Sequence, residues 1–510
     1  MQQFTRATVL ATIFAVSIFC QSLEQFEKKV TEFTLANGMH FIIVERHEAP
    51  VVAFHTYVNV GAVDDPSGQT GLAHMFEHMA FKGTAQIGTK DWPAEKQAME
   101  KLELDYDAYD QERNKGLHAD PNRMKTLWDR VKTDIAAADK YVIPNQYPEI
   151  IETNGGTGLN AETGYDATQY FYKFPSNRIE LWFLLESERF YDPVFREFYK
   201  ERDVVREERR MRIESEPQGL LQESFLATAF EAHPYHHPPA GWASDIENLR
   251  LDDAVNFYKK YYVPSNIDVA IVGDVYPKQA RAFAEKYFGI IPKGGNPPLV
   301  ETVEPQQQGE RIVDVNSESQ PLEIVGYKRP NELSDDDQVF DMINEVLSGG
   351  RTGTIYKDLV QDKKLALAAG AVASYPSGKY PNLFMLYIVP NMNKSLEDCE
   401  KELYVVVDRL KSEKVDDTTL KRVRTKLRAD LIRQLDSNSG LAAQLNFFYA
   451  SFGDWRKLFT QLNEYDRINA DNIQRVAKKY LVPETRTIGR LVQPANAGGP
   501  VKTQSEGAKN

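Results

Sequence analysis

One sequence pattern occurs twice in this chain, and it limits the fold more than any other feature. Residues 259–264 (Lys-Lys-Tyr-Tyr-Val-Pro) precede the apolar run Asp268–Gly273, and residues 478–483 (Lys-Lys-Tyr-Leu-Val-Pro) precede the apolar run Thr487–Val492. Each copy has the character of a basic helix end, a proline that stops the helix, and a buried strand. The repetition indicates two copies of one α+β unit.

The beginnings of the two segments correspond as well. The strand-like run Val51–Val60 leads to a helical segment around His74, and the strand-like run Leu322–Tyr327 leads to a helical segment at Asp337–Leu347. Both segments therefore have strand patterns at their beginning and end and helical patterns in between.

This repetition predicts the domain organisation. A chain of 510 residues is too long for one ordinary core, so we predict an α+β protein with two homologous halves, residues 28–292 and 310–494. The linker between them, residues 293–309, is rich in Pro, Gly and Gln and has no hydrophobic periodicity. A polar, Gly-rich tail follows at residues 495–510.

The first half has a charged region that the second half lacks. Residues 91–141 contain two helical patterns separated by a turn at residues 116–118, and Asp120-Pro121 is a good start for the second helix. We predict an inserted helical hairpin. It could be a lid or a docking surface, or it could be a solvent-facing addition without a role.

The first residues have the character of a targeting signal. Arg6 provides a positive charge, Ala7 to Phe19 form an uncharged and mostly apolar run, and small or polar residues around Cys20 suit a cleavage site. The apolar run is short for a membrane span. We therefore predict a signal peptide at residues 1–22 and an extracytoplasmic protein, periplasmic or secreted, without a transmembrane segment after its removal. An uncleaved anchor and a lipidated cysteine are the alternatives.

Cysteine content and charge limit the chemistry. Cys20 and Cys399 are the only cysteines, so a disulfide framework or a cysteine zinc site is not expected, and a metal would need histidine and carboxylate ligands. The net charge is −13, from 61 basic and 74 acidic residues. This balance argues against nucleic acid as a partner, because phosphate binding requires a basic surface.

The segment 72–81 is the strongest candidate for chemistry. On a helix, one of its faces is apolar and the nearly opposite face carries polar side chains at the same spacing. The apolar face comprises Leu72, Met75, Phe76 and Met79, and the other face comprises His74, Glu77, His78 and Phe81. His74 and His78, one turn apart, have Cβ atoms about 5–6 Å apart and can converge on one zinc ion. Glu77 lies beside that position. A solvated polar face is the alternative.

A third ligand is expected on a long helical run predicted from Pro193 to about Glu216. Glu201 and Glu208 fall within its apolar stripe, whereas Glu207 lies about 100° round the helix and is expected in solvent. The other members of the stripe are Val204, Val205 and Met211. A buried carboxylate needs a cation or hydrogen bonds, so the two glutamates should either bind a metal or pair with neighbouring arginines.

Three segments resemble the pitrilysin/insulinase family of inverted-zincin metallopeptidases, which includes the mitochondrial processing peptidases. Residues 71–84 (GLAHMFEHMAFKGT) resemble the active-site helix of the family, and residues 201–210 (ERDVVREERR) resemble its second motif. Residues 158–163, followed by Thr168 and Tyr170, resemble the strand that pairs with substrate backbone. The resemblance implies that each half is a mixed β-sheet layered with α-helices and that the two halves enclose a chamber.

The resemblance also implies roles for single residues. The ligands of one zinc ion per chain would be His74, His78 and Glu208. Glu77 would be the catalytic base, Glu201 would support the zinc ligands, and the strand at Asn160 and Ala161 would pair with a peptide substrate. The chain would then be a zinc-dependent endopeptidase that hydrolyses peptides or unfolded protein segments, since bound zinc polarises the scissile carbonyl and lowers the pKa of water to about 7.

The chain departs from the family pattern in two places. The insertion moves Glu208 to 130 residues beyond His78, further than is usual in the family. Val360 and Leu367 occupy the places of an Arg and a Tyr with which active members contact the substrate from the second half. We therefore predict a heterodimer with a paralogous chain that carries the Arg/Tyr pair.

Other interpretations remain open at this point. Arg351 and Tyr356 could serve as the pair, although their spacing of five differs from the spacing of seven in the family. The alternative function is a non-catalytic zinc-containing subunit or a peptide-binding module of a peptidase complex. An organellar presequence peptidase is disfavoured by the apolar character of the first residues.

Overall fold

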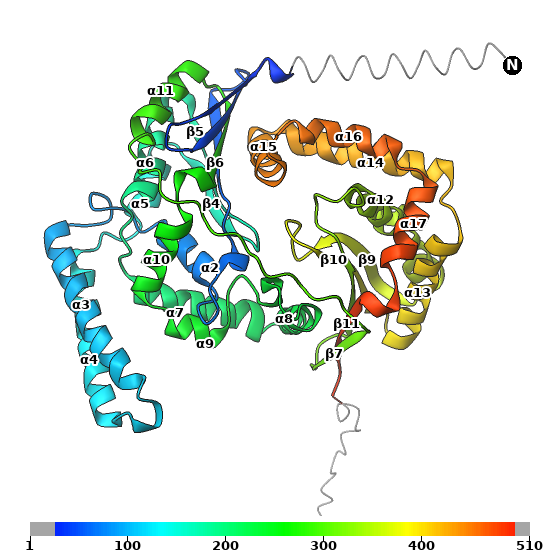
Figure 1. Ribbon diagram of the computed structural model, residues 1–510, viewed down its shortest axis with the longest axis horizontal. Helices are drawn as coiled ribbons and strands as arrows, with labels where there is room; N and C mark the ends of the chain where they lie inside the picture. Colours follow the sequence, from blue (N-terminus) through cyan, green and yellow to red (C-terminus); the bar gives the residue numbers. More distant parts are fainter. Residues whose placement is uncertain (1–25, 495–510) are drawn as a thin grey trace, which may run out of the picture. The chain divides into compact units, whose positions relative to one another are not determined.

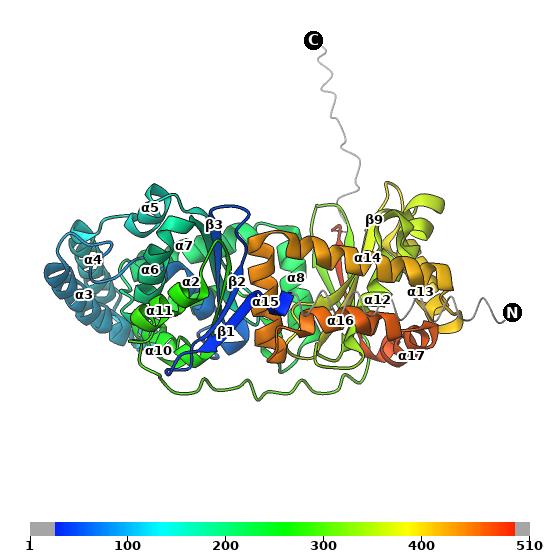
Figure 2. The ribbon, with the colours of Figure 1, turned by 90° about the horizontal axis from the view of Figure 1, so that it is seen from above.

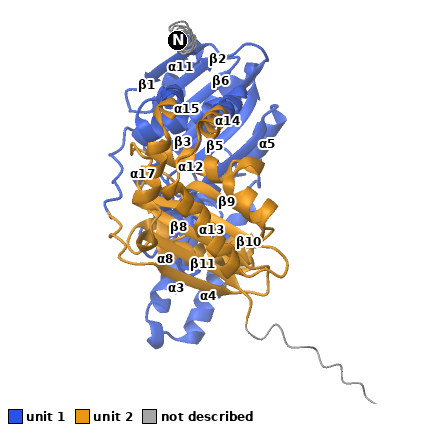
Figure 3. Cartoon of the chain, turned by 90° about the vertical axis from the view of Figure 1, so that its right-hand side faces the viewer, with its two compact units in different colours: residues 1–207, 238–301, 428–463 blue, residues 208–237, 302–427, 464–510 orange. Residues whose placement is uncertain are grey.

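The computed structural model describes residues 26–494. The chain forms two compact units, each assembled from segments that are distant in the sequence (Figure 3). Of the described residues, the first unit contains 26–207, 238–301 and 428–463, and the second contains 208–237, 302–427 and 464–494. The predicted signal peptide, residues 1–22, and the predicted tail, residues 495–510, lie outside the described residues.

The first unit is built on a six-stranded mixed sheet (Figure 1). Its strand order is β1 (Val30–Thr34), β2 (His40–Glu45), β6 (Ile267–Gly273), β3 (Val51–Val58), β5 (Thr168–Pro175) and β4 (Thr157–Thr163). β2 and β6 are parallel and the other neighbours are antiparallel. The central strands β2, β6 and β3 are buried almost throughout. Burial of both faces explains why their sequences are nearly continuous apolar runs.

The second unit contains a five-stranded sheet of the same design. Its order is β7 (Arg311–Asn316), β11 (Arg486–Val492), β8 (Leu322–Arg329), β10 (Asn382–Pro390) and β9 (Ala366–Tyr375). β7 and β11 are parallel and the other neighbours are antiparallel. The order and the strand directions match those of the first sheet without β1, so the duplication seen in the sequence extends to the topology. The predicted α+β fold with two homologous mixed sheets is confirmed.

One face of the first sheet packs against helices that are close to it in the sequence. These helices are α2 (Leu72–Met79), α6 (Ile179–Tyr191), α10 (Leu251–Tyr261) and α11 (Pro277–Tyr287). In this core the ring of Phe54 on β3 stacks on Trp182 of α6, with ring centroids 4.4 Å apart, and Phe288 packs against Trp182 from the end of α11.

The other face of the first sheet is covered by a helix from near the end of the chain. α15 (Asn438–Phe452) lies against β3 and β6 (Figures 1 and 2). Leu441, Leu445 and Phe448 pack with Ile42 and Val272 in a core of their own. A helix that belongs to the second copy by sequence therefore completes the first unit.

The second unit receives a helix in return. α8 (Pro217–Ala229), which belongs to the first copy by sequence, packs on β11 and β7. The ring of Phe225 fills the space above Gly326 and Gly489, where an added Cβ would lie 2.7 Å and 3.1 Å from this ring. We refer to the reciprocal placement of α8 and α15 as the helix exchange.

Residues 91–141 form a helical hairpin in the first unit. α3 (Trp92–Arg113) and α4 (Pro121–Ala138) lie side by side and are joined by a short turn at Gly116–His118. The side chains of Asp91 and Asp120 cap the two helices by accepting hydrogen bonds from backbone N–H groups of their first turns.

The remaining helices are α5 (Gln146–Thr153), α7 (Phe198–Arg209), α9 (Ala243–Asn248), α12 (Asp337–Ser348), α13 (Leu396–Ser412), α14 (Asp417–Asp436), α16 (Lys457–Arg467) and α17 (Ala470–Tyr480). The linker residues 293–309 contain no helix or strand. Within residues 26–494, no helix combines the length and apolar character that crossing a membrane requires.

The helix predicted from Pro193 to about Glu216 is wrong at its beginning, whereas its end is close to the predicted one. Pro193 forms an isolated β-bridge with Thr84, and Glu197 adopts a left-handed backbone with φ of 59°, so α7 begins only at Phe198. After Arg209 the chain continues as a π-helical turn, Arg210–Glu214.

The predicted apolar stripe of this helix is also wrong in part. Val205 is fully buried, but Val204 and Met211 are 48% and 53% exposed. Arg202 and Arg209 take inward positions instead, because their guanidinium groups are hydrogen-bonded to Tyr106 and paired with Glu223, respectively.

Candidate metal centre

Helix α2 begins at a turn that the local sequence specifies. Gly71 precedes it with φ of 93°, a left-handed conformation that disfavours side chains, and an added Cβ would lie 2.9 Å from the carbonyl oxygen of Ala240. The carboxylate of Asp65 accepts hydrogen bonds from the N–H groups of Gly71, at 2.7 Å, and Ala73, at 2.9 Å. Asp65 thereby caps the helix. Its burial raises the pKa of its carboxyl well above the ordinary value, although both N–H groups oppose the shift.

The two faces of α2 are separated as the sequence predicts. Leu72, Met75, Phe76 and Met79 are buried, whereas His74, Glu77 and His78 are half-buried. The ring of Phe76 anchors the helix against Tyr262 and Tyr258, with centroids 3.9 Å and 5.6 Å away. The polar face therefore has a rigid support.

The three predicted metal ligands come together. Ligand atoms of His74, His78 and Glu208 lie within 4.8 Å of one another. Within residues 26–494, no other group of three or more His, Cys, Asp or Glu side chains lies this close together. The two imidazole rings are nearly perpendicular, with centroids 4.9 Å apart. Glu208 lies on α7, one position after the residue at which this segment of the first unit ends. Glu207 itself is exposed.

This donor set fits a zinc ion. Two imidazoles and one carboxylate are a common ligand set of catalytic zinc, which keeps its fourth position open. The carboxylate of Glu208 also lies 2.6 Å from the guanidinium of Arg212, whose side chain is 76% exposed. An ion pair with such an exposed partner is weak, so it opposes metal binding only slightly.

Glu77 lies on the same face as the two histidines and near a pair of buried phenols. The hydroxyl groups of Tyr170 and Tyr262 are 3.1 Å apart. Burial raises the pKa of both phenols, and the negative charge of Glu77 raises it further. Both tyrosines therefore stay neutral beside the Glu77 carboxylate.

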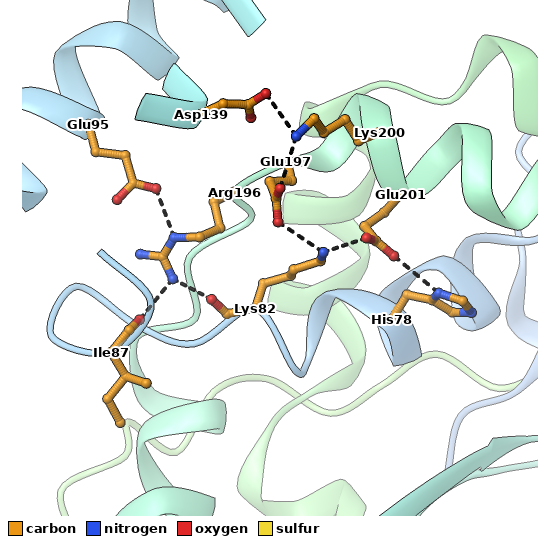
Figure 4. Close-up of polar contacts among 9 residues, drawn as sticks. All are labelled: His78, Lys82, Ile87, Glu95, Asp139, Arg196, Glu197, Lys200 and Glu201. Atoms are coloured by element: carbon orange, nitrogen blue, oxygen red, sulfur yellow. Dashed lines mark hydrogen bonds and ion pairs between the residues drawn. The ribbon is translucent and has the colours of Figure 1, made fainter. Parts of the chain in front are cut away.

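Glu201 connects His78 to a chain of ion pairs (Figure 4). Its Oε2 lies 3.3 Å from Nδ1 of His78, and its Oε1 accepts a hydrogen bond from the ammonium group of Lys82. Burial alone would raise the pKa of the Glu201 carboxyl, but the contacts with His78 and Lys82 outweigh it and lower the pKa. Glu201 is therefore ionised next to the candidate ligand.

A cavity of about 290 Å³ opens beside Glu77 and His78. Phe81, Lys82, Glu197, Glu201 and the loop 142–148, which follows the hairpin, also line it. Ionised carboxylates and an aromatic ring therefore share the space next to the candidate centre.

The residues expected to bind substrate lie on an edge strand. Asn160 and Ala161 are part of β4, which pairs with β5 and ends the sheet. β4 also contacts α2. An edge strand has unpaired backbone N–H and C=O groups, which can bind an extended peptide.

The second unit contains the positions expected to carry an Arg and a Tyr. Val360 is half-buried in a π-helical segment, Tyr356–Asp362, and Leu367 is 60% exposed at the start of β9. The alternative residue Arg351 is exposed, and Tyr356 is half-buried. Neither Val360 nor Leu367 can donate a side-chain hydrogen bond.

The sequence does not indicate that two further residues, Lys82 and Arg196, belong to the site. Lys82 follows α2 within the motif, but its partners are more than 110 positions away. Arg196 is fully buried and donates hydrogen bonds to the carbonyl groups of Lys82, Thr84 and Ile87 and to the carboxylate of Glu95. A lone arginine before a helix gives no indication of this role.

Two models of known families match the chain. The model described as Insulinase (Peptidase family M16) matches residues 40–114 and 137–241. The model described as Peptidase M16 inactive domain matches residues 248–427. The unmatched stretch inside the first model, residues 115–136, contains the turn of the hairpin and most of α4.

Several similar proteins come from bacteria. The zinc protease PqqE of Helicobacter pylori is 27% identical over 482 residues, which are 93% of this chain and 94% of that protein. A crystal structure of a protease from Helicobacter pylori has a TM-score of 0.75 at 25% identity and covers 91% of this chain and 99% of its own. The first half of the periplasmic protease PqqL from Escherichia coli has a TM-score of 0.65 at 16% identity, with coverage of 91% and 92%, and shows a likeness of fold.

Proposed function

Because this chain belongs to the insulinase (M16) family of peptidases, we propose that it is a zinc-dependent endopeptidase acting on peptides or unfolded protein segments. The observation that carries the proposal is the convergence of His74, His78 and Glu208 within 4.8 Å, next to the acidic side chain of Glu77. A zinc ion held there would act as a Lewis acid and lower the pKa of water.

The side chains of this protein would perform the remaining steps. Glu77 accepts a proton from the attacking water and delivers it to the nitrogen of the leaving amine, so that cleavage of the C–N bond yields a carboxylate and an amine. Glu201 holds His78 in position. The substrate backbone adds to the free edge of β4 at Asn160 and Ala161, a mode that accepts many sequences because it uses main-chain hydrogen bonds.

We further propose that the active form is a heterodimer. The apolar residues Val360 and Leu367 provide no donor for a substrate carbonyl, and residues 248–427, which include both positions, match a family model described as an inactive domain. A paralogous chain with an Arg/Tyr pair would supply the donors. The second candidate function, a peptide-binding zinc subunit without activity of its own, is favoured by the same observation.

The proposed location is extracytoplasmic. The apolar run from Ala7 to Phe19 supports export, and so does the similarity in fold to a periplasmic protease. Cell fractionation and the N-terminal sequence of the mature protein test this proposal, and recovery of the intact first 22 residues in the cytoplasm would overturn it.

One experiment separates the two candidate functions. The purified chain, alone and with a paralogous chain, is incubated with an unstructured peptide, with and without a zinc chelator. Cleavage that the chelator abolishes supports the peptidase. One bound zinc and peptide binding without cleavage under either condition would support the non-catalytic subunit.

A further inference from the structure

The proposed zinc ligand His78 is connected to the inserted hairpin by side chains of alternating charge. From the metal centre outward, the groups are His78, Glu201, Lys82, Glu197, Lys200 and Asp139 (Figure 4). All of them belong to the first unit. Asp139 lies directly after α4, at the base of the hairpin.

Lys82 occupies the centre of this chain of charges. Its ammonium group lies 3.0 Å from Oε2 of Glu197 and also donates to Glu201. Its side chain is only 20% exposed, and those of both glutamates are 16% exposed. Two ionised carboxylates this close together would repel each other without the cation between them. Lys82 therefore determines where the Glu201 carboxylate can lie.

The outer part of the chain of charges holds Glu197. The ammonium group of Lys200 lies 3.1 Å from Oε1 of Glu197 and 2.8 Å from Oδ2 of Asp139. The two lysines hold the pKa of the Glu197 carboxyl below its usual value, although burial acts in the opposite direction. Glu197 thus stays charged between them.

The hairpin has a second connection to the same place. Glu95, near the start of α3, is fully buried and lies 2.8 Å from Nε of Arg196. The guanidinium of Arg196 also donates to the backbone carbonyl of Lys82. The base of the hairpin thus holds Lys82 at two places. Arg196 holds the backbone of Lys82, and Lys200 and Glu197 hold its side chain.

We infer that Lys82 is a positioning residue for the zinc ligand His78, and that the base of the hairpin supports it through Asp139, Lys200 and Glu197. This inference rests on the proposed zinc site. Replacement of a group that orients a metal ligand commonly lowers metal affinity by about 10- to 100-fold. If Lys82 acted only by electrostatic repulsion of the zinc ion, loss of its charge would instead raise the zinc affinity. The direction of the change in zinc affinity therefore separates orientation of His78 from repulsion of the metal.

The test is the zinc affinity of the full-length chain, measured by competition with a chromophoric chelator. Lys82→Met should weaken zinc binding by about 10- to 100-fold, and Lys82→Arg should restore most of the affinity because it keeps the cation. Lys200→Met, at a position that is 44% exposed, and Asp139→Asn should each weaken binding by a few-fold. The matched control is Asp129→Asn, which removes exposed ion pairs of α4 that do not lead to the site.

A double variant tests the connection itself. If Lys200 acts through Glu197 and Lys82, then Lys82→Met/Lys200→Met should bind zinc no more weakly than Lys82→Met alone. Additive losses, or zinc binding by Lys82→Met that equals or exceeds that of the wild type, would overturn this inference and leave the proposed function intact. A wild-type chain that binds no zinc would overturn both.

Discussion

Nδ1 of His78 lies 3.3 Å from Oε2 of Glu201. A neutral imidazole has one N–H group and one lone pair, so an Nδ1–H that donates to this carboxylate leaves the lone pair on Nε2. The contact thereby selects the tautomer in which Nε2 can bind a metal. His78 therefore needs little reorganisation when zinc arrives.

Glu77→Gln should retain zinc but lose nearly all hydrolysis. The metal ligands are unchanged, whereas the amide cannot accept the proton of the attacking water, and loss of a general base commonly lowers turnover by about 10²–10⁴-fold. The measurements are metal content after dialysis and kcat on an unstructured peptide. Undiminished turnover in a zinc-loaded variant would exclude Glu77 as the base.

Glu208→Gln should weaken zinc binding severely, whereas the matched variant Glu207→Gln should not. Glu208 offers a carboxylate oxygen within 4.8 Å of the histidine ligand atoms, while Glu207 is exposed. Loss of a direct ligand should cost more than the roughly 10- to 100-fold of a supporting group. Chelator competition measures both affinities, and the reverse ranking would contradict the assignment of ligands.

The isolated chain should hydrolyse peptides poorly until a paralogous partner is added. Val360 and Leu367 cannot donate hydrogen bonds, and the absence of one donor to a developing oxyanion costs about 10²–10³-fold in turnover. The measurement is kcat of the chain alone, of the partner alone and of the mixture. Full activity of the isolated chain, unchanged by any partner, would show that the second unit supports hydrolysis without an Arg/Tyr pair from another chain.

The contribution of His55 to the stability of the protein should fall below about pH 6.5. This residue is fully buried on β3, and its burial lowers its pKa to about 4 from an ordinary value of 6.5. Between these values the unfolded chain binds the proton at His55 and the folded chain does not, so the contribution of His55 to the free energy of unfolding is constant above pH 6.5 and decreases as the pH falls toward 4.

The size of this effect can be isolated with His55→Gln. From pH 7 to pH 5 the wild type should lose on the order of 2 kcal/mol through His55, since each pH unit below 6.5 costs up to about 1.4 kcal/mol. Denaturant unfolding at both pH values provides the measurement. His233, whose pKa is also lowered to about 4 by burial, titrates in both proteins. Equal pH dependence of the two proteins would rule out the contribution of His55.

Asn446→Ala should destabilise the first unit. The amide of this fully buried residue on α15 donates to the carbonyl oxygens of His55, at 2.8 Å, and Asp268, at 3.2 Å. A buried acceptor left without its donor costs about 1–3 kcal/mol, which denaturant unfolding can measure. The control Ser439→Ala changes an exposed position of the same helix and should have little effect. Equal stability of the two variants would argue against a role for Asn446 in holding α15.

The parts of the fold that follow from local pattern could be predicted from the sequence. Helix α2 has one apolar and one polar face because its apolar residues recur with the helical period, and the paired ends of the two copies correspond to β6 and β11. The stripe on α7 was predicted less well. Periodicity counts apolar residues as inward, whereas the buried positions there include Arg202 and Arg209, whose charges have partners on other elements.

Contacts between residues that are distant in the sequence could not be predicted from hydrophobic periodicity. The amphipathic pattern of α15 indicates that one face is covered, but not that the cover is the sheet of the other copy. Likewise, nothing near Lys82 indicates an ion pair with Glu201, which lies 119 positions away. The positive φ of Glu197, which delays the start of α7, is also rare for a residue of its type.

The helix exchange has a consequence for synthesis on the ribosome. His55 on β3 and its partner Asn446 on α15 are 391 positions apart, so at roughly 5–20 residues per second about 20–80 s pass between their emergence. During this time the apolar face of β2 with Ile42 and Val44 lacks its permanent cover. The nascent chain must therefore be shielded by other parts of itself or by chaperones, and the first unit can be completed only when nine-tenths of the chain has been made.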